Sequence, residues 1–171
     1  MFNAPGYPAR IPKPPRPDLY QVGSTPDMGQ GVFAKCDIKR GELILAERPL
    51  LVAPCTIMLP RGTFRGDHYT DEVKNQITMS EFESMLETTI GRFPPEIQAD
   101  FRALHNSHTG DGSGPLLGIS RTNGYTTANL YDGSDKEARY TAICKIASRI
   151  NHRLFPLLCR RIWLTSSQLH P

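Results

Sequence analysis

Two short motifs far apart in the chain carry residue types that could hold a small ligand. The first is the turn Gly29-Gln30-Gly31, followed at once by Val32-Phe33-Ala34. Glycines at such a turn let the main chain approach a bound molecule closely. The second is the polar pair Asn151-His152. Taken alone, each motif has a plain structural interpretation: a tight turn that needs positive φ for the glycines, and a helix C-terminus for Asn151-His152.

The common catalytic signatures are absent from the sequence. It contains no GxSxG, no HExxH and no GxGxxG between a strand and a helix. The Gly-rich run Thr109–Pro115 lacks the GxxxxGK[ST] order of a phosphate-binding loop. The four cysteines, Cys36, Cys55, Cys144 and Cys159, show no CxxC spacing. We therefore expect reduced thiols in a cytoplasmic or nuclear protein, and no disulfide framework or zinc site.

The elements that must position these motifs begin after a proline-rich arm. Residues 1–18 hold six of the 15 prolines, and we expect them to form an extended, mobile arm. Short apolar runs separated by Gly, Pro and Asp then indicate short strands with tight turns. The predicted strands are Leu19–Val22, Val32–Ala34, Leu43–Glu47 and Pro49–Val52.

Helices are predicted for the middle of the chain, as an insertion over about residues 70–108. Ser80–Glu83 has the capping-box pattern of a helix N-terminus, and Pro95 can open a second helix that buries Phe101. Leu116–Ile119 indicates a strand. A second capping box, Ser134–Glu137, predicts a last helix. Its inward residues would be Ala138, Ala142, Ile143, Ile146, Ala147 and Ile150.

This order of features resembles a SET domain, the fold of most protein lysine methyltransferases. The family opens with a GxG turn, an aromatic or aliphatic residue and Ala, as in Met28–Ala34 here, and continues with an I-x-x-G-x-x-I turn, as in Ile38–Ile44. A Glu-x-Pro-Leu segment follows at Glu47–Leu50. The segment Ala147–His152, which ends in Asn151-His152 and includes Arg149, resembles the first half of the family signature R-[FI]-[IL]-N-H-S-C-x-P-N. The resemblance covers roughly Tyr20–His152 and is nearest the SMYD-like and fungal SET group, without its MYND finger.

The resemblance implies an α+β, β-rich SET-type fold of short strands and small sheets with a helical insertion. It also implies S-adenosylmethionine as the cofactor and no metal. Family members place the GxG backbone against the methionine end of the cofactor and hold it with the Asn-His pair. Asn123 occupies the place of an Asn that the subfamily with long helical insertions carries. The cofactor-binding residues implied in this way are Met28, Gly29, Gln30, Asn123, Asn151 and His152.

After Asn151-His152 the sequence departs from the family pattern. The family continues with Ser-Cys-x-Pro-Asn, further strands and a late catalytic Tyr. This chain reads Arg153-Leu154-Phe155-Pro156-Leu157, and its last tyrosine is Tyr140. We therefore expect a partial SET domain over 19–152 that lacks the C-terminal strands, and a divergent basic tail over 153–171. The resemblance then assigns no catalytic residue, and methyl transfer should be impaired.

Three functions stay open at this point. The first is a protein-lysine methyltransferase or a remnant of one, and the second is a non-catalytic protein-interaction module on a SET-like core. The third is another small β-clip domain that binds sugars or acids, against which Asn151-His152 argues. The expected partner is a protein substrate or another protein, and a monomer is expected.

The charge and hydropathy of the sequence argue against two kinds of partner, nucleic acid and membranes. Lys and Arg number 20 against 17 Asp and Glu, and a net charge of +3 is too small to indicate nucleic acid. No apolar run approaches the roughly 20 residues of a membrane helix. No secretory leader is visible either, so we expect no association with a membrane.

Overall fold

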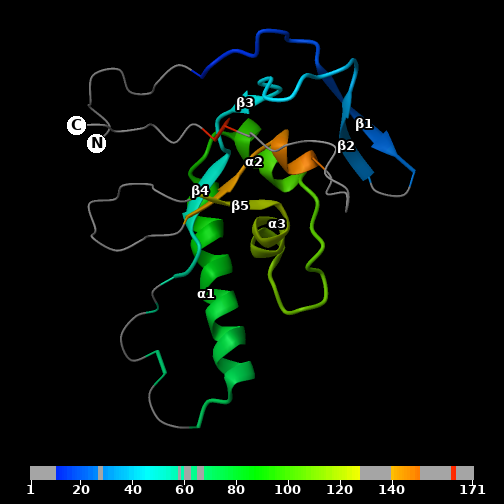
Figure 1. The fold of residues 1–171 in the computed structure, drawn as a ribbon. Coiled ribbons are helices and arrows are strands. Elements are labelled where there is room, and N and C mark those ends of the chain that lie inside the picture. The colour runs from blue at the N-terminus through cyan, green and yellow to red at the C-terminus, as the bar shows by residue number, and fades with distance from the viewer. Residues whose placement is uncertain are drawn as a thin grey trace, which may run out of the picture.

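The computed structural model describes residues 11–26, 29–57, 59, 63–64, 68–127 and 140–150, together with the backbone of 163–164. Helices and small sheets make a mixed α+β fold, which confirms the predicted fold class at this level (Figure 1). The elements are β1 (Tyr20–Thr25), β2 (Gly29–Ala34), β3 (Ala46–Glu47), β4 (Leu51–Pro54), α1 (Asp71–Gly91), α2 (Pro95–Arg102), α3 (Pro115–Asn123), β5 (Gly124–Thr127), β6 (Tyr140–Ile143), the 3-10 turn η1 (Ala147–Arg149) and β7 (Trp163–Leu164).

β1 and β2 form an antiparallel hairpin, and the GxG motif, expected as a turn, is instead the first half of β2: Gly29, Gln30 and Gly31 pair with residues 25, 24 and 23. The register runs from Tyr20 opposite Ala34 to Thr25 opposite Gly29, so both predicted strands are confirmed and are longer than expected. Gly29 has a φ of 68°, a conformation that glycine adopts without the steric cost of a Cβ. The first residue of β2 is therefore glycine for a backbone reason.

The part of the proline-rich arm that the structure describes is held by one bidentate ion pair. Arg16 Nε lies 2.7 Å from Glu42 Oε1, and Arg16 Nη2 lies 2.8 Å from Glu42 Oε2. Arg16 also donates to the Asp37 carbonyl oxygen at 3.1 Å. These contacts fix the chain just before β1 against the turn that follows β2.

The long helix α1 begins at Asp71, and the capping box expected at Ser80–Glu83 is wrong. Thr70 is the N-cap, and its hydroxyl oxygen accepts from the Val73 amide at 3.4 Å. Since helix continues through Ser80, the amides there are already paired within the helix and need no cap. α2 begins at Pro95 as predicted, and Phe101 is fully buried.

Two further predictions from local pattern are also wrong. Leu116–Ile119, expected as a strand, lies in α3. The strand prediction is wrong because a short apolar run that is buried on several sides shows neither the helical nor the strand period. Ala142 and Ile143, expected in a helix, lie in β6, the central strand of a three-stranded antiparallel sheet of order β4-β6-β5. The capping box at Ser134–Glu137 lies outside the described residues.

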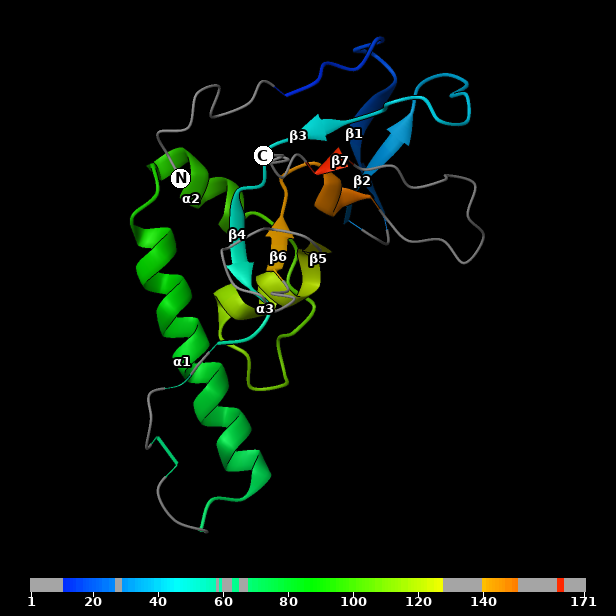
Figure 2. The same cartoon turned by 60° about the vertical axis from the view of Figure 1, so that its left-hand side comes forward.

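Helices α1 and α3 lie side by side against the β4-β6-β5 sheet and enclose the main core (Figures 1 and 2). Its fully buried side chains include Leu86, Ile90, Phe101, Leu116 and Ile143. A second, smaller cluster is made by Leu45 just before β3, Cys144 just after β6 and Ala147 in η1. No helix among the described residues is both long and apolar enough to cross a bilayer.

Candidate functional site

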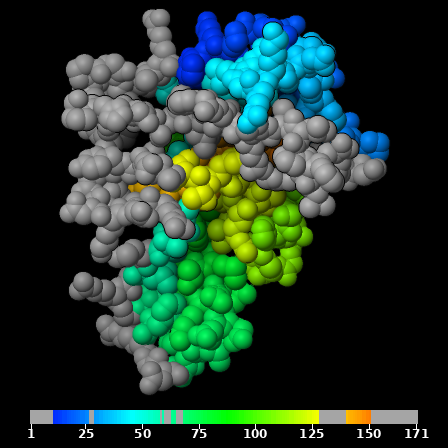
Figure 3. Space-filling view, in the orientation of Figure 1, coloured from blue at the N-terminus to red at the C-terminus, as the bar shows by residue number. Residues whose placement is uncertain are grey.

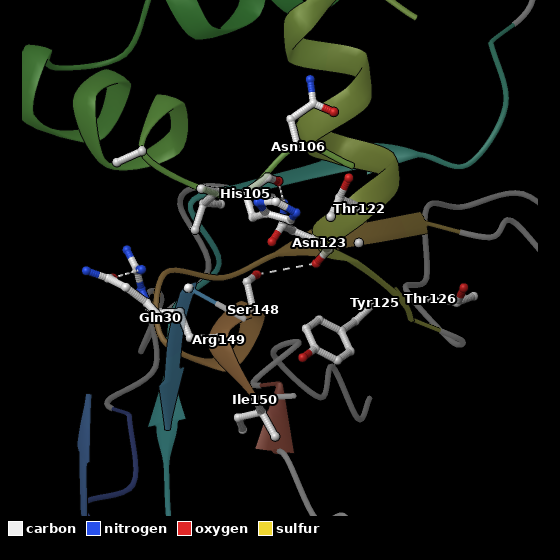
Figure 4. A pocket seen from close by; sticks show the side chains of 14 residues that line it. Gln30, His105, Asn106, Thr122, Asn123, Tyr125, Thr126, Ser148, Arg149 and Ile150 are labelled. Atoms are coloured by element: carbon white, nitrogen blue, oxygen red, sulfur yellow. Dashed lines mark hydrogen bonds between the residues drawn. The ribbon is translucent and has the colours of Figure 1, made fainter. Parts of the chain in front are cut away.

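A cavity of about 970 Å³ lies where four separate segments of the chain meet (Figure 4). Its walls are Gly29 and Gln30 of β2, the loop Ala103–Asn106 after α2, the α3–β5 junction Thr122–Thr126, and Ser148–Ile150 at η1. In Figure 3, residues of α3 and β5 reach the surface between the hairpin and α1. We name this space the central cavity.

The structure brings three of the sequence-predicted site residues together in the central cavity. Gly29, Gln30 and Asn123 all line it. Ile150, which precedes Asn151 directly in the chain, lines it as well. Met28, Asn151 and His152 lie outside the described residues.

Asn123 is buried and fastens two walls of the cavity to each other. Its amide group donates to the His105 carbonyl oxygen at 2.7 Å and to the Ile119 carbonyl oxygen at 2.8 Å. The Ser148 hydroxyl donates to the Asn123 carbonyl oxygen at 3.4 Å. Because both N–H groups of the side chain are used, its carboxamide oxygen is the atom that can accept from a ligand.

Glu47 of β3 fixes the η1 wall of the cavity through hydrogen bonds to its backbone. Its carboxylate accepts from the Ala147 amide at 2.6 Å and from the Ile146 amide at 3.0 Å. The Tyr125 hydroxyl donates to the Ala147 carbonyl oxygen at 2.5 Å. Burial, and to a lesser extent the charge of Glu47, raises the pKa of the Cys144 thiol to about 12. The Glu-x-Pro-Leu segment therefore fixes the chain that leads into Asn151-His152.

A carboxylate on α1 positions α3, and with it Asn123. Glu83 accepts from the Leu116 amide at 2.9 Å and from the Leu117 amide at 2.7 Å. These two amides lie in the first turn of α3 and have no partner within that helix. The N-cap residue, Gly114, has no side chain that could accept from them. A Cβ at Gly114 would overlap the Glu83 carboxylate, so a larger residue there would push Glu83 from its present position beside the two amides.

Arg121 connects α3 to the Gly-rich loop outside the cavity. Its guanidinium lies 2.7 Å from Asp111 Oδ2 and 2.6 Å from the Ser113 hydroxyl. Hydrogen bonds from the Ser113 amide and from His108 hold the pKa of Asp111 far below its ordinary range. This exposed cluster supports the loop and takes no part in the central cavity.

Arg149 sets the electrostatic character of the cavity. Its Nη1 donates to the carboxamide oxygen of Gln30, and its Nε donates to the Lys145 carbonyl oxygen at 3.2 Å. The described lining contains no carboxylate and no thiol, and Arg149 is its one side chain with a permanent charge. The sequence had placed Arg149 in a family signature without assigning it a role.

The arrangement suits the binding of a small polar ligand that carries an anionic group. Ligand cavities commonly enclose roughly 300–1,000 Å³, so this one can hold a nucleoside with an amino-acid substituent. Across the described ranges, no group of three or more His, Cys, Asp or Glu side chains is arranged to hold a metal ion. Sequence reasoning missed His105, Tyr125 and Ser148 as lining residues, since only their place in the fold brings them there.

The chain matches no protein-family model, no curated protein and no solved structure. What the protein does must therefore be inferred from its own motifs and from the geometry that brings them together.

Proposed function

We propose that the central cavity binds S-adenosylmethionine and that the protein is a SET-type member of the protein-lysine methyltransferases. One observation carries this proposal. Gly29 and Gln30 from the opening motif, Asn123 from the middle of the chain, and Ile150 beside Asn151 all line the same cavity. If these motifs were only a turn and a helix end, nothing would require them to converge on one space.

The described residues fit this cofactor. Gly29 offers main chain that a ligand can approach, since a Cβ there would meet nothing within 4 Å. Asn123 offers a carboxamide oxygen as an acceptor, and the Tyr125 ring forms part of the apolar surface. Asn151 and His152 are proposed to complete the site, by side chain and by backbone and ring edge respectively.

S-adenosylmethionine supplies a methyl group that a neutral lysine amine can take in one displacement, leaving S-adenosylhomocysteine while the amine proton passes to solvent. A free lysine has a pKa of about 10.4, so a methyltransferase has to desolvate the amine and remove its proton. The family resemblance gives that task partly to a late tyrosine, which has no counterpart after Tyr140 here. We therefore propose cofactor binding without efficient methyl transfer for the 171-residue chain.

Calorimetric titration of the 171-residue protein with S-adenosylmethionine tests the proposal. We expect saturable binding at one site, weakened at least tenfold by Asn151→Ala. Glu81→Ala is the matched control, because Glu81 is exposed on α1 and does not line the cavity, and this variant should bind like the original protein. Absence of binding to protein shown to be folded by circular dichroism would overturn the proposal. The non-catalytic interaction module would then be the better interpretation.

A further inference from the structure

We propose that Arg149 and Gln30 together form the subsite for the carboxylate at the amino-acid end of the bound cofactor. This inference rests on the proposed function and names the group that the site recognises. The two side chains come from different elements, η1 and β2, and meet on one wall of the central cavity (Figure 4). Arg149 Nη1 donates to Gln30 Oε1, which closes the wall between the hairpin and η1.

Within the part of the chain that the structure describes, the charge of Arg149 is not neutralised by an acidic side chain. Among the described residues, no carboxylate forms an ion pair with Arg149. Two carboxylates that contact the neighbouring segment Lys145–Ala147 have other partners: Glu47 accepts from backbone amides, and Asp100 pairs with Lys145 at 2.6 Å. A cation that lines a cavity without a carboxylate on the same lining favours a ligand that brings its own negative charge.

The hydrogen-bonding capacity of the pair matches a carboxylate. A guanidinium has five N–H donors, and Arg149 uses one on Gln30 and its Nε on Lys145. The remaining donors suit the paired oxygens of a carboxylate. Gln30 accepts through its oxygen, so its amide N–H groups are the ones left to donate to the same anion. Gln30 thus acts as a positioning residue for Arg149 and as a second donor.

This subsite recognises a group that the cofactor keeps after methyl transfer. S-adenosylhomocysteine has the same carboxylate and lacks the sulfonium charge. Because the described lining offers no acid to that charge, its loss should cost no affinity there. S-adenosylhomocysteine is therefore expected to bind at least as tightly as S-adenosylmethionine, which makes it a suitable probe.

The subsite is tested by comparing the binding of two ligands to the original protein and to a variant that lacks the Arg149 guanidinium. The ligands are S-adenosylhomocysteine and 5′-methylthioadenosine, which keeps the nucleoside and thioether but has no amino acid. Arg149→Gln should weaken binding of S-adenosylhomocysteine about tenfold or more, as expected when a charge-assisted hydrogen bond is lost. Binding of 5′-methylthioadenosine should stay within about twofold, because that ligand never reaches the subsite.

Gln30→Glu provides a second, independent variant. The new carboxylate would pair with Arg149 and compete with the ligand, so affinity for S-adenosylhomocysteine should again fall while that for 5′-methylthioadenosine is kept. Arg149→Lys should retain part of the affinity, since it keeps the charge without the planar fork.

The outcomes separate the subsite from the proposed function. If Arg149→Gln weakens both ligands equally, Arg149 only supports the wall and the subsite is wrong. If it weakens neither, the subsite is also wrong, although the cavity still binds the nucleoside. If the original, folded protein binds neither ligand, the proposed function fails and the subsite fails with it.

Discussion

Gly29 and Gly91 differ in backbone conformation and not in available space. A Cβ at either position would meet nothing within 4 Å, but only Gly29 has a positive φ, of 68°. Gly29→Ala should destabilise the fold by about 1–2 kcal/mol through backbone strain alone. Gly91→Ala should be neutral or stabilise it by up to about 1 kcal/mol, because alanine favours helix. Urea unfolding measures both, and equal effects would contradict this explanation of Gly29 in the GxG motif.

Cys144 gives the stability of the protein a pH dependence in the alkaline range. Burial raises the pKa of its thiol from an ordinary 9.0 to about 12 in the folded protein. The unfolded thiol loses its proton near pH 9 and the folded one does not, so ionisation favours unfolding as the pH rises from 9 to 12. We expect the free energy of unfolding to fall across this range. Below pH 9 the contribution of Cys144 to stability should be complete, because the thiol is protonated in both states.

Cys144→Ala is the control for that titration. The variant should show a shallower fall in the free energy of unfolding between pH 9 and 12, whatever its stability at pH 7. Part of the fall should remain, because burial and the charge of Glu47 also raise the pKa of Tyr20. The free energy of unfolding of both proteins is measured by chemical denaturation at each pH. If it falls with the same slope in both, Cys144 does not titrate as described.

At the scale of elements, α3 depends on a cap supplied by another helix. Glu83 of α1 accepts from the amides of Leu116 and Leu117 and so joins the two helices at the end of α3 opposite Asn123. Glu83→Ala leaves both amides without their partner and should destabilise the fold by about 1–3 kcal/mol. The exposed Glu81, two residues earlier on the same helix, is the matched control. Glu81→Ala should change stability by less than about 0.5 kcal/mol.

The same pair of variants separates the cap from the cavity. Because α3 carries Asn123 at its C-terminus, loosening its start should also weaken the proposed cofactor binding in Glu83→Ala and leave it unchanged in Glu81→Ala. A Glu83→Ala protein as stable as the original, by thermal and urea unfolding, would mean that α3 does not need this cap.

At the scale of the whole molecule, the central cavity is made by segments that lie far apart in the sequence. β2, the loop after α2, the α3–β5 junction and η1 each supply one wall. Glu47 links β3 to η1, while Glu83 links α1 to α3. Ligand binding should therefore depend on the folded molecule as a whole, and ligand should raise its unfolding temperature.

The 171-residue chain should bind the cofactor but transfer no methyl group above background. No tyrosine follows Tyr140 in the sequence, and the Tyr125 hydroxyl in the cavity is bonded to the Ala147 carbonyl oxygen. Incubation with labelled S-adenosylmethionine and lysine-containing peptides, read by mass spectrometry, checks this expectation. Turnover on any peptide would contradict it and would require another group to take the amine proton.

Some features could be predicted from the sequence because they depend on neighbouring residues. The β1–β2 hairpin and the start of α2 at Pro95 follow from local backbone preferences, and the structure agrees, although the GxG motif lies in β2 and not in a turn. The capping-box pattern at Ser80–Glu83 predicted a helix start wrongly, because α1 already begins at Asp71 and Glu83 caps α3, which is distant in sequence. Local pattern cannot show such a partner.

The sequence by itself determined the α+β class, the hairpin and a short set of polar and glycine residues worth testing. Gly29 and Gln30 were among them because of the GxG motif, and Asn123 because of the family resemblance. Only the tertiary structure decided that these three line one cavity, that Leu116–Ile119 is helical and that Arg149 is the cation on the lining. The physical reason is that turns and caps are settled over a few residues, whereas a cavity and its charge depend on contacts between distant segments.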